Sequence, residues 1–266
     1  MFGGKQTYTN LCDIHCHVLP GLDDGADSLE TAVAMCRQAA EEGIATVVAT
    51  PHFNDRYQPS DDAVNNALGD LRAAIADLGL RLELLLGADV AVSPGLKELV
   101  SSRPSLTFEG KGKYMLLEPP AQFMPEWLNE VVFDLRIEGI NVIITHPERN
   151  AEVIDDPNVI IPLVQSGVLV QVTADSLAGT FGPEIRRCAV SLLRMNAVHF
   201  IATDAHSAQF RSPCLREAIR VATRYLGDDA VRLTRENPLA AIRGDEVVVP
   251  DPEPIRRWFG RMTAAH

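Results

Sequence analysis

In the stretch DIHCHVLPGLDDG, residues 13–25, two histidines are followed by a loop that carries two adjacent aspartates. His15 and His17 are two residues apart in a segment that reads as a β-strand. Alternate residues of a strand point to the same face, so this spacing predicts that both imidazoles point inward while Ile14 and Cys16 point away. The pair is either a structural feature of a half-buried strand or one side of a metal site.

Histidines and carboxylates also follow other short apolar stretches of the chain. They are His52 in ATPH, Asp89 in GAD, Glu118 in LLEPP, His146 in ITHPE, and Asp204 and His206 in TDAH. One such residue is usually structural, but five of the seven histidines occupy these positions, which chance does not readily produce. The other two, His199 and His266, are expected to be a structural residue and a tail residue.

The mixture of side chains indicates which metals to expect. Imidazole together with carboxylate is typical of Zn, Mn or Fe sites, whereas carboxylates alone favour Mg or Ca. With Asp24 added from the loop after the first strand, the set is larger than the four ligands of one tetrahedral ion. The sequence therefore predicts a site for two to three ions.

The elements that must position these residues alternate along the chain. Seven nearly continuous apolar stretches predict parallel strands covered on both faces: 10–17, 45–52, 82–90, 112–120, 140–148, 167–175 and 198–206. Amphipathic stretches between them predict helices near 28–42, 62–79, 124–138, 155–166, 183–196 and 213–226. Asp27 and Glu30 form a predicted capping box for the first helix, and Gly43 is its predicted stop.

This alternation indicates an α/β fold with right-handed crossovers, either a barrel or an open doubly wound sheet. In both folds the C-terminal ends of the strands build the active site, which is where the candidate residues fall. No linker or repeat divides the chain. We therefore expect a single domain over 1–266, with a core of about 11–245 and a short C-terminal extension.

Composition and charge exclude several classes of function. A net charge of −12 argues against nucleic acid or an anionic membrane as the main partner. No apolar run approaches the roughly 18 residues that span a bilayer, and the N-terminus does not read as a signal peptide. Five cysteines without framework spacing suit a reducing compartment, so we expect a cytoplasmic protein.

Two cysteines match the bare spacing C-x5-R of cysteine-dependent phosphatases. They are Cys188 in CAVSLLR and Cys214 in CLREAIR. A thiolate phosphatase needs a phosphate-binding loop of backbone N–H groups, usually rich in glycine, and both matches lie without glycine inside helical patterns. We expect neither thiol to be a nucleophile.

The motifs DIHCH…DDG, TPH, LLEPP, THPER and TDAHS resemble those of the polymerase-and-histidinol-phosphatase (PHP) superfamily of metal hydrolases. Within it, DIHCHVLPGLDDGADSLETAVAM, ATPHFN, ITHPERN and IATDAHSAQFR resemble bacterial protein-tyrosine phosphatases of capsule and exopolysaccharide operons. The likeness runs from about residue 11 to about 245. It implies a distorted, TIM-like barrel of seven β/α units, the PHP fold.

The resemblance also implies the residues of the site. It implies a trinuclear centre of manganese or another divalent transition metal, such as Fe, Co or Zn, with these ligands: His15, His17, Asp24, His52, Asp89, Glu118, His146, Asp204 and His206. It implies that Arg149 and Arg211 contact phosphate, and it assigns no role to Asp23. The family usually has glutamate in place of Asp89, so the shorter aspartate is expected to alter one metal position.

These features together predict a phosphatase that hydrolyses phosphotyrosine in a protein, expected to be a tyrosine kinase of polysaccharide export. Clustered cations would activate a water molecule as hydroxide for attack on phosphorus, with Asp24 or His52 assisting the leaving group. Phe53 and Tyr57 either line a rim for an aromatic substrate or pack within a loop. The alternatives are a small-molecule phosphatase, acting on histidinol phosphate or a nucleotide, and a metal-binding regulator without catalysis.

Overall fold

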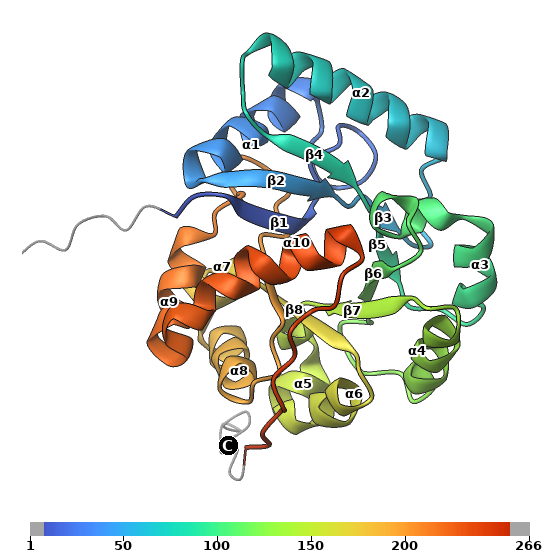
Figure 1. Ribbon diagram of the computed structural model, residues 1–266, viewed down its shortest axis with the longest axis vertical. Helices are drawn as coiled ribbons and strands as arrows, with labels where there is room; N and C mark the ends of the chain where they lie inside the picture. Colours follow the sequence, from blue (N-terminus) through green and yellow to red (C-terminus); the bar gives the residue numbers. More distant parts are fainter. Residues whose placement is uncertain (1–7, 256–266) are drawn as a thin grey trace, which may run out of the picture.

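The computed structural model describes residues 8–255, which form parallel strands surrounded by helices (Figure 1). The strands are β1 (Leu11–Cys16), β2 (Ile44–Ala49), β3 (His52–Phe53), β4 (Glu83–Leu86), β5 (Asp89–Ala91), β6 (Tyr114–Glu118), β7 (Asn141–Thr145), β8 (Leu169–Thr173) and β9 (Phe200–Ala202). They form two sheets, one in the order β1-β2-β4 and one in the order β3-β5-β6-β7-β8-β9. The sequence-based prediction of a parallel α/β fold is confirmed. That the whole chain is one domain stays a prediction.

Two of the seven predicted strands are each divided into two shorter strands. The stretch 45–52 becomes β2 and β3 on either side of Pro51, which has no N–H for the sheet. The stretch 82–90 becomes β4 and β5 around Gly87, where a Cβ atom would lie 2.9 Å from the Phe108 ring. The chain therefore passes from one sheet to the other at the same level in both segments.

Backbone hydrogen bonds join the first strand to the segment that follows the last one. The N–H of His17 donates to the carbonyl oxygen of Ala205 at 2.8 Å, and the N–H of Asp204 donates to the carbonyl oxygen of His15 at 2.8 Å. In an open doubly wound sheet the outer strands are free edges. This contact of β1 with the end of β9 is typical of the distorted barrel that the sequence predicted.

Two clusters of buried apolar residues lie on opposite faces of the strands. The smaller one takes residues from β1, β2, β6, β7, β8 and β9, with Phe108 and Ile242 packed against it, so it fills the space that the strands surround. The larger cluster lies between strands and helices. Ile14 belongs to the inner cluster and Cys16 to the outer one. The predicted orientation of Ile14 is wrong, because the register of β1 against β2 shifts after Asp13.

Helices follow most strands and cover the outer face (Figure 1). They are α1 (Leu29–Glu42), α2 (Asp61–Asp77), α3 (Leu96–Ser102), α4 (Leu128–Ile137), α5 (Ala151–Asp155), α6 (Ile161–Gln165), α7 (Ala174–Ala178), α8 (Pro183–Arg194), α9 (Arg216–Leu226) and α10 (Glu236–Arg243). The predicted helix 155–166 is instead α5, a 3-10 turn and α6, because Pro157 and Pro162 interrupt the N–H pattern. The sequence did not predict α3, α7 and α10.

The ends of α1 show which capping signals the fold uses. Ser28, not Asp27, is the N-cap, and its Oγ accepts from the N–H of Thr31 at 3.2 Å. The carboxylate of Asp27 accepts instead from the Thr31 hydroxyl at 2.6 Å. Gly43 ends the helix at a φ of 88°, as predicted, since glycine adopts this left-handed conformation without strain.

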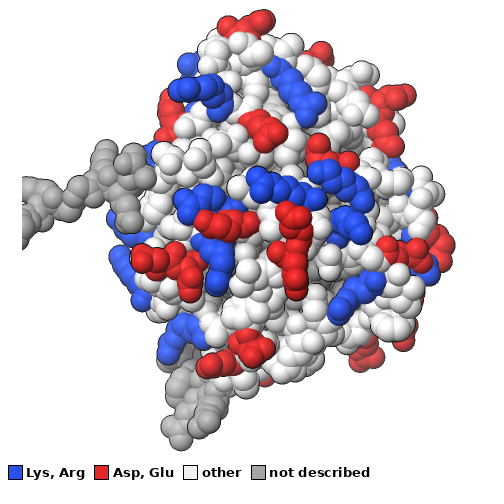
Figure 2. All heavy atoms as spheres, in the orientation of Figure 1, with Lys and Arg blue, Asp and Glu red and all other residues white. Residues whose placement is uncertain are grey.

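The segment after α10 runs back along the barrel (Figure 1). The hydroxyl of Tyr114 donates to the carbonyl oxygen of Asp245, and the N–H of Ile255 donates to the Asn158 side chain at 2.9 Å. On the face in Figure 2, acidic and basic side chains are interspersed rather than gathered by sign. None of the helices formed by residues 8–255 combines the length and apolar character needed to cross a membrane.

Candidate metal centre

Three imidazoles are fixed through Nδ1 and direct Nε2 toward one another at the C-terminal ends of the strands. Nδ1 of His15 lies 3.0 Å from Oε1 of Gln171, and Nδ1 of His17 lies 2.7 Å from Oδ2 of Asp23. Nδ1 of His206 donates to the carbonyl oxygen of Asp204 at 2.9 Å. With Nδ1 as the donor in each ring, the three Nε2 atoms carry lone pairs that suit a metal.

The Nε2 atoms of His15 and His17 lie 3.1 Å apart, and both also face Oδ1 of Asp204, at 3.4 and 3.3 Å. If both imidazoles are neutral with Nδ1 as donor, these are three acceptors in contact. A cation between them would remove that repulsion. All three side chains are almost fully buried, so water does not relieve it.

A second set of side chains comes from the other side of the barrel, where His52 and Asp89 begin β3 and β5, Glu118 ends β6 and His146 follows β7. Nδ1 of His52 lies 3.2 Å from Oδ2 of Asp89 and 3.6 Å from Oε2 of Glu118. Nε2 of His146 lies 3.5 Å from Oε1 of Glu118. Oδ2 of Asp89 is also 3.5 Å from Nε2 of His15, so this set is continuous with the first.

Asp24 lies at the entrance of the site, with 49% of its side chain exposed. Its Oδ1 lies 3.5 Å from Nε2 of His52 and 3.6 Å from Nε2 of His206. The structure thus brings together every predicted ligand: His15, His17, Asp24, His52, Asp89, Glu118, His146, Asp204 and His206. That they bind metal stays a prediction.

Three overlapping groups have potential ligand atoms within 4.8 Å of one another: His17, Asp24, His52 and His206; His15, His17 and Asp89; and His52, Asp89 and Glu118. Three atoms inside this cluster, Nδ1 of His52, Oδ2 of Asp89 and Nε2 of His206, are buried without a hydrogen-bond partner among residues 8–255. Buried polar atoms are normally paired, and metal ions would satisfy these. The residues present therefore fit a centre of two or three divalent ions.

The electrostatics of the protein alone favour added positive charge. Burial and the nearby Asp89 raise the pKa of Glu118 to about 7, because the cluster holds more anionic oxygen than it can neutralise. Burial acts to lower the pKa of His17, but hydrogen bonds to Asp204 and Asp23 raise it to about 10. Burial and the neighbouring His17 lower the pKa of His206 to about 2. Two such imidazoles cannot both carry protons, whereas both can bind a metal.

Three residues of the site have a left-handed backbone conformation, which residues other than glycine seldom adopt. His146, Asp204 and Arg211 have φ values of 34°, 51° and 52°. His146 and Asp204 come just after the ends of β7 and β9, and Arg211 lies in the loop between β9 and α9. Such strain costs on the order of 1 kcal/mol per residue and is concentrated at functional sites.

Several residues that hold the centre in place had no role in the sequence-based prediction. Asp23 is buried and accepts hydrogen bonds from His17, from the N–H of His52 at 2.9 Å and from the N–H of Gly25 at 2.9 Å. Gln171 comes from β8, whose predicted stretch 167–175 supplied no candidate for the site. The adjacent aspartates Asp23 and Asp24 could have suggested a role for Asp23. Nothing in the sequence near Gln171 indicates that it orients the imidazole of His15.

Two further carboxylates position the loops of the site. Asp13 accepts from the N–H of Thr203 at 2.9 Å and from its hydroxyl, which ties β1 to the residue before Asp204. Glu148 is buried and accepts from the N–H of Thr173 and from the hydroxyl of Ser176. Both lie beside predicted ligands in the sequence, and their partners are more than 20 residues away.

Arg149 and Arg211 meet at a single carboxylate oxygen. Their Nη2 atoms lie 2.7 and 2.6 Å from Oδ2 of Asp204. The Nε atoms of both arginines have no hydrogen-bond partner among the described residues. Because a guanidinium has five N–H donors, each arginine can keep its contact with Asp204 and still bind an anion.

A hollow of about 340 Å³ opens over the cluster, and its lining includes Asp24, Glu118, His146, Arg149 and Arg211. Metal-ligand candidates and two arginines thus face the same space. A phosphorylated side chain that enters it would meet both.

Of the two aromatic residues after His52, only Tyr57 contacts that histidine. Its ring is nearly parallel to that of His52, with centroids 6.1 Å apart. The Phe53 ring instead lies under the guanidinium of Arg103 at 4.8 Å, beside a different hollow. The two aromatic residues therefore do not form one rim.

His199 and the two cysteines lie apart from the centre. Nδ1 of His199 accepts from the N–H of Val170, as expected for a structural residue. His266 lies outside the described residues. Burial raises the pKa of the Cys188 thiol and, together with Glu42, raises that of Cys214 to about 12. Neither pKa suits a thiolate nucleophile.

Comparison with known proteins identifies close relatives of this chain. Tyrosine-protein phosphatase YwqE of Bacillus subtilis is 32% identical over 248 residues, which cover 93% of this chain and 97% of the relative. The putative tyrosine-protein phosphatase CapC of Staphylococcus aureus is 33% identical over 210 residues, covering 78% and 81%.

Solved structures agree with these relatives. A crystal structure from work on YwqE of Bacillus subtilis and CpsB of Streptococcus pneumoniae, described as unique metal-dependent tyrosine phosphatases, is 31% identical with a TM-score of 0.88 and covers 93% of this chain. The phosphotriesterase homology protein of Escherichia coli shares the fold, at a TM-score of 0.57 and 12% identity. The family model for capsular polysaccharide synthesis, CpsB/CapC, matches residues 11–243, and the chain belongs to that family.

Proposed function

We propose that this chain is a metal-dependent protein-tyrosine phosphatase. The observation that carries the proposal is the convergence of the metal-ligand candidates and two arginines on one open hollow. A phosphate monoester binds through its anionic oxygens and reacts with water, and this site offers groups for both tasks. The relatives named tyrosine-protein phosphatases support the choice of substrate class.

The nine ligand candidates would hold two or three divalent ions, manganese in our proposal, and these ions would activate water and neutralise phosphoryl charge. Arg149 and Arg211 would bind the phosphoryl oxygens with paired N–H groups, a geometry that lysine does not reproduce. Because both also contact Asp204, the phosphate would be positioned against the ligand cluster.

Asp24 and His52 are the groups that we propose for assisting the leaving phenolate. They lie together on the exposed side of the cluster, with Asp24 facing the opening. Tyrosine has a pKa near 10, so its oxygen needs less help from an acid than a serine alkoxide does. The openness of the site to solvent suits a phosphotyrosine that is carried by a protein.

As the physiological substrate we propose a tyrosine kinase of polysaccharide export. Support comes from the family, whose description is capsular polysaccharide synthesis. We also propose a cytoplasmic location, since all five cysteines are free thiols and four are buried, which suits a reducing compartment.

Phosphate release from a phosphotyrosyl peptide by the manganese-loaded protein tests this proposal. We expect a higher kcat/KM for the peptide than for histidinol phosphate, and two or three ions per chain. Asp89→Glu serves as the matched variant, because it keeps the charge and extends the carboxylate by one methylene. Metal content near one ion with no turnover would instead indicate a metal-binding regulator.

A further inference from the structure

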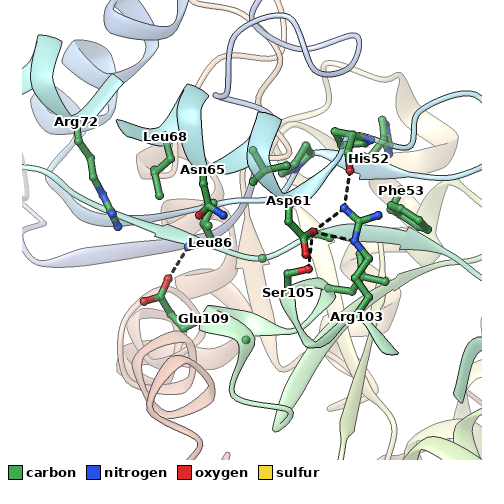
Figure 3. A pocket seen from close by; sticks show the side chains of 17 residues that line it. His52, Phe53, Asp61, Asn65, Leu68, Arg72, Leu86, Arg103, Ser105 and Glu109 are labelled. Atoms are coloured by element: carbon green, nitrogen blue, oxygen red, sulfur yellow. Dashed lines mark hydrogen bonds and ion pairs between the residues drawn. The ribbon is translucent and has the colours of Figure 1, made fainter. Parts of the chain in front are cut away.

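A second hollow adjoins the metal centre and has no part in the proposed chemistry. Its volume is about 350 Å³, and it lies between α2, the chain on either side of the breaks at Pro51 and Gly87, and the segment 103–110 (Figure 3). His52 lines both hollows. The two hollows are therefore neighbours that share one of the proposed metal ligands as a lining residue.

The surface of this hollow is mixed, with somewhat more apolar than polar area. Leu68, Leu106 and Pro51 are buried residues of its lining, and Val64 and Phe53 are partly buried beside them. In Figure 3, Leu68 points from α2 toward the strands, with Leu86 opposite. Water on the apolar part of this surface is readily displaced by an apolar group.

The charged groups around the hollow are already paired with protein atoms. Arg103 donates to Oδ1 of Asp61 from Nε and Nη2, at 2.8 and 2.6 Å, and also to the carbonyl oxygen of Pro59 (Figure 3). Ser105 donates to the same oxygen of Asp61 at 2.9 Å. This network ties the segment 103–110 to the start of α2.

The other two charges in the lining are engaged in the same way. Arg72 donates to the carbonyl oxygen of Leu84 from Nε at 3.2 Å and from Nη2 at 2.5 Å. Oε1 of Glu109 accepts from the N–H of Leu86 at 2.6 Å. A charged ligand would have to compete with these contacts, whereas an apolar group would not.

We propose that this hollow binds an apolar side chain of the substrate polypeptide, a few residues from the phosphotyrosine. The inference rests on the proposed function, since the phosphotyrosine in the first hollow fixes where the polypeptide passes. An extended chain advances roughly 3.3–3.6 Å per residue, and the two hollows share His52, so a nearby residue reaches the second hollow. The apolar surface and the paired charges select a side chain such as leucine.

Adjacent asparagines on α2 offer a matched test. Both Asn65 and Asn66 are exposed, but only Asn65 lines the hollow. Asn65→Trp would fill the hollow without changing the core, and Asn66→Trp is the control. The substrates are free phosphotyrosine and phosphotyrosyl peptides of glycine and serine in which one leucine is moved through successive flanking positions.

For the wild type we expect one leucine position to raise kcat/KM by about tenfold over the peptide without leucine, as burial of an apolar side chain implies. Asn65→Trp should reduce this ratio to near one and leave kcat/KM for free phosphotyrosine unchanged. Asn66→Trp should keep the wild-type ratio.

Two kinds of result, the second of which can take two forms, would overturn the inference while the proposed function stands. One is a wild type that hydrolyses phosphotyrosine but has no preferred leucine position. The other is an equal effect of Asn65→Trp and Asn66→Trp, or of Asn65→Trp on peptides and on free phosphotyrosine. Absence of phosphate release from every phosphotyrosine substrate would reject the proposed function itself and this inference with it.

Discussion

Asp23 accepts three hydrogen bonds at the edge of the metal centre, so Asp23→Asn tests how far that centre depends on a residue that is not a ligand candidate. Oδ2 accepts hydrogen bonds from Nδ1 of His17 at 2.7 Å and from the N–H of His52 at 2.9 Å. Oδ1 accepts a hydrogen bond from the N–H of Gly25 at 2.9 Å. Asparagine has the same shape but only one oxygen, and its NH₂ group would face a donor.

The cost follows from these contacts. If the amide oxygen of Asp23→Asn keeps the hydrogen bonds from His17 and His52, the hydrogen bond from Gly25 is lost. The two hydrogen bonds that remain then have a neutral acceptor instead of a charged carboxylate. A hydrogen bond to a charged group contributes about 1.5–3 kcal/mol. We therefore expect the free energy of unfolding of the metal-free protein to fall by about 2–3 kcal/mol. Loss of the group that orients a ligand should also weaken metal binding about 10- to 100-fold.

Urea denaturation in the presence of a chelator measures the first effect, and calorimetric titration with Mn²⁺ measures the second. Asp24→Asn is the matched control at the neighbouring position. Asp24 is half-exposed, and its ion-pair partners among residues 8–255 are His52 and His206, at 3.5 and 3.6 Å. Its variant should bind metal more weakly but change the metal-free stability by less than about 0.5 kcal/mol. If both variants have the same metal-free stability, the role given to Asp23 is wrong.

Three further predictions concern residues inside and outside the site. Burial lowers the pKa of His199 to about 4 from 6.5, so the folded protein holds it neutral and should lose about 3 kcal/mol of stability as pH falls from 6.5 through 4. His199→Asn, which removes the titrating group, should flatten that part of the pH profile in urea denaturation; an unchanged slope would contradict this. Arg211→Lys should lower kcat/KM for phosphotyrosyl peptides about tenfold without changing the melting temperature, because lysine cannot form paired N–H contacts; wild-type kinetics would argue against phosphate binding. Cys214→Ser should keep full activity in the same assay, and its inactivation would place a thiol in the chemistry.

The strands and the ligand candidates could be predicted because their signals are local. An apolar run specifies a buried strand by itself, and a histidine or carboxylate directly after it must lie at the C-terminal edge of a parallel sheet. Thus Asp89, Glu118 and His146 could be placed at one edge before any contact was known. The breaks in two strands also have local causes, Pro51 and Gly87, but whether they divide a strand depends on what each segment packs against.

The functional groups of this protein could be read from its amino-acid sequence: imidazoles and carboxylates near the ends of parallel strands, and two arginines in the loops that follow. How these groups are held depends on contacts that form only in the folded protein. Gln171 orients His15 across 156 residues of sequence, and both arginines meet at Asp204. The hollow beside His52 likewise forms only where α2 and the segment 103–110 come together. Local composition sets the type of a side chain and its strand end, whereas its partners come from distant segments that folding brings into contact.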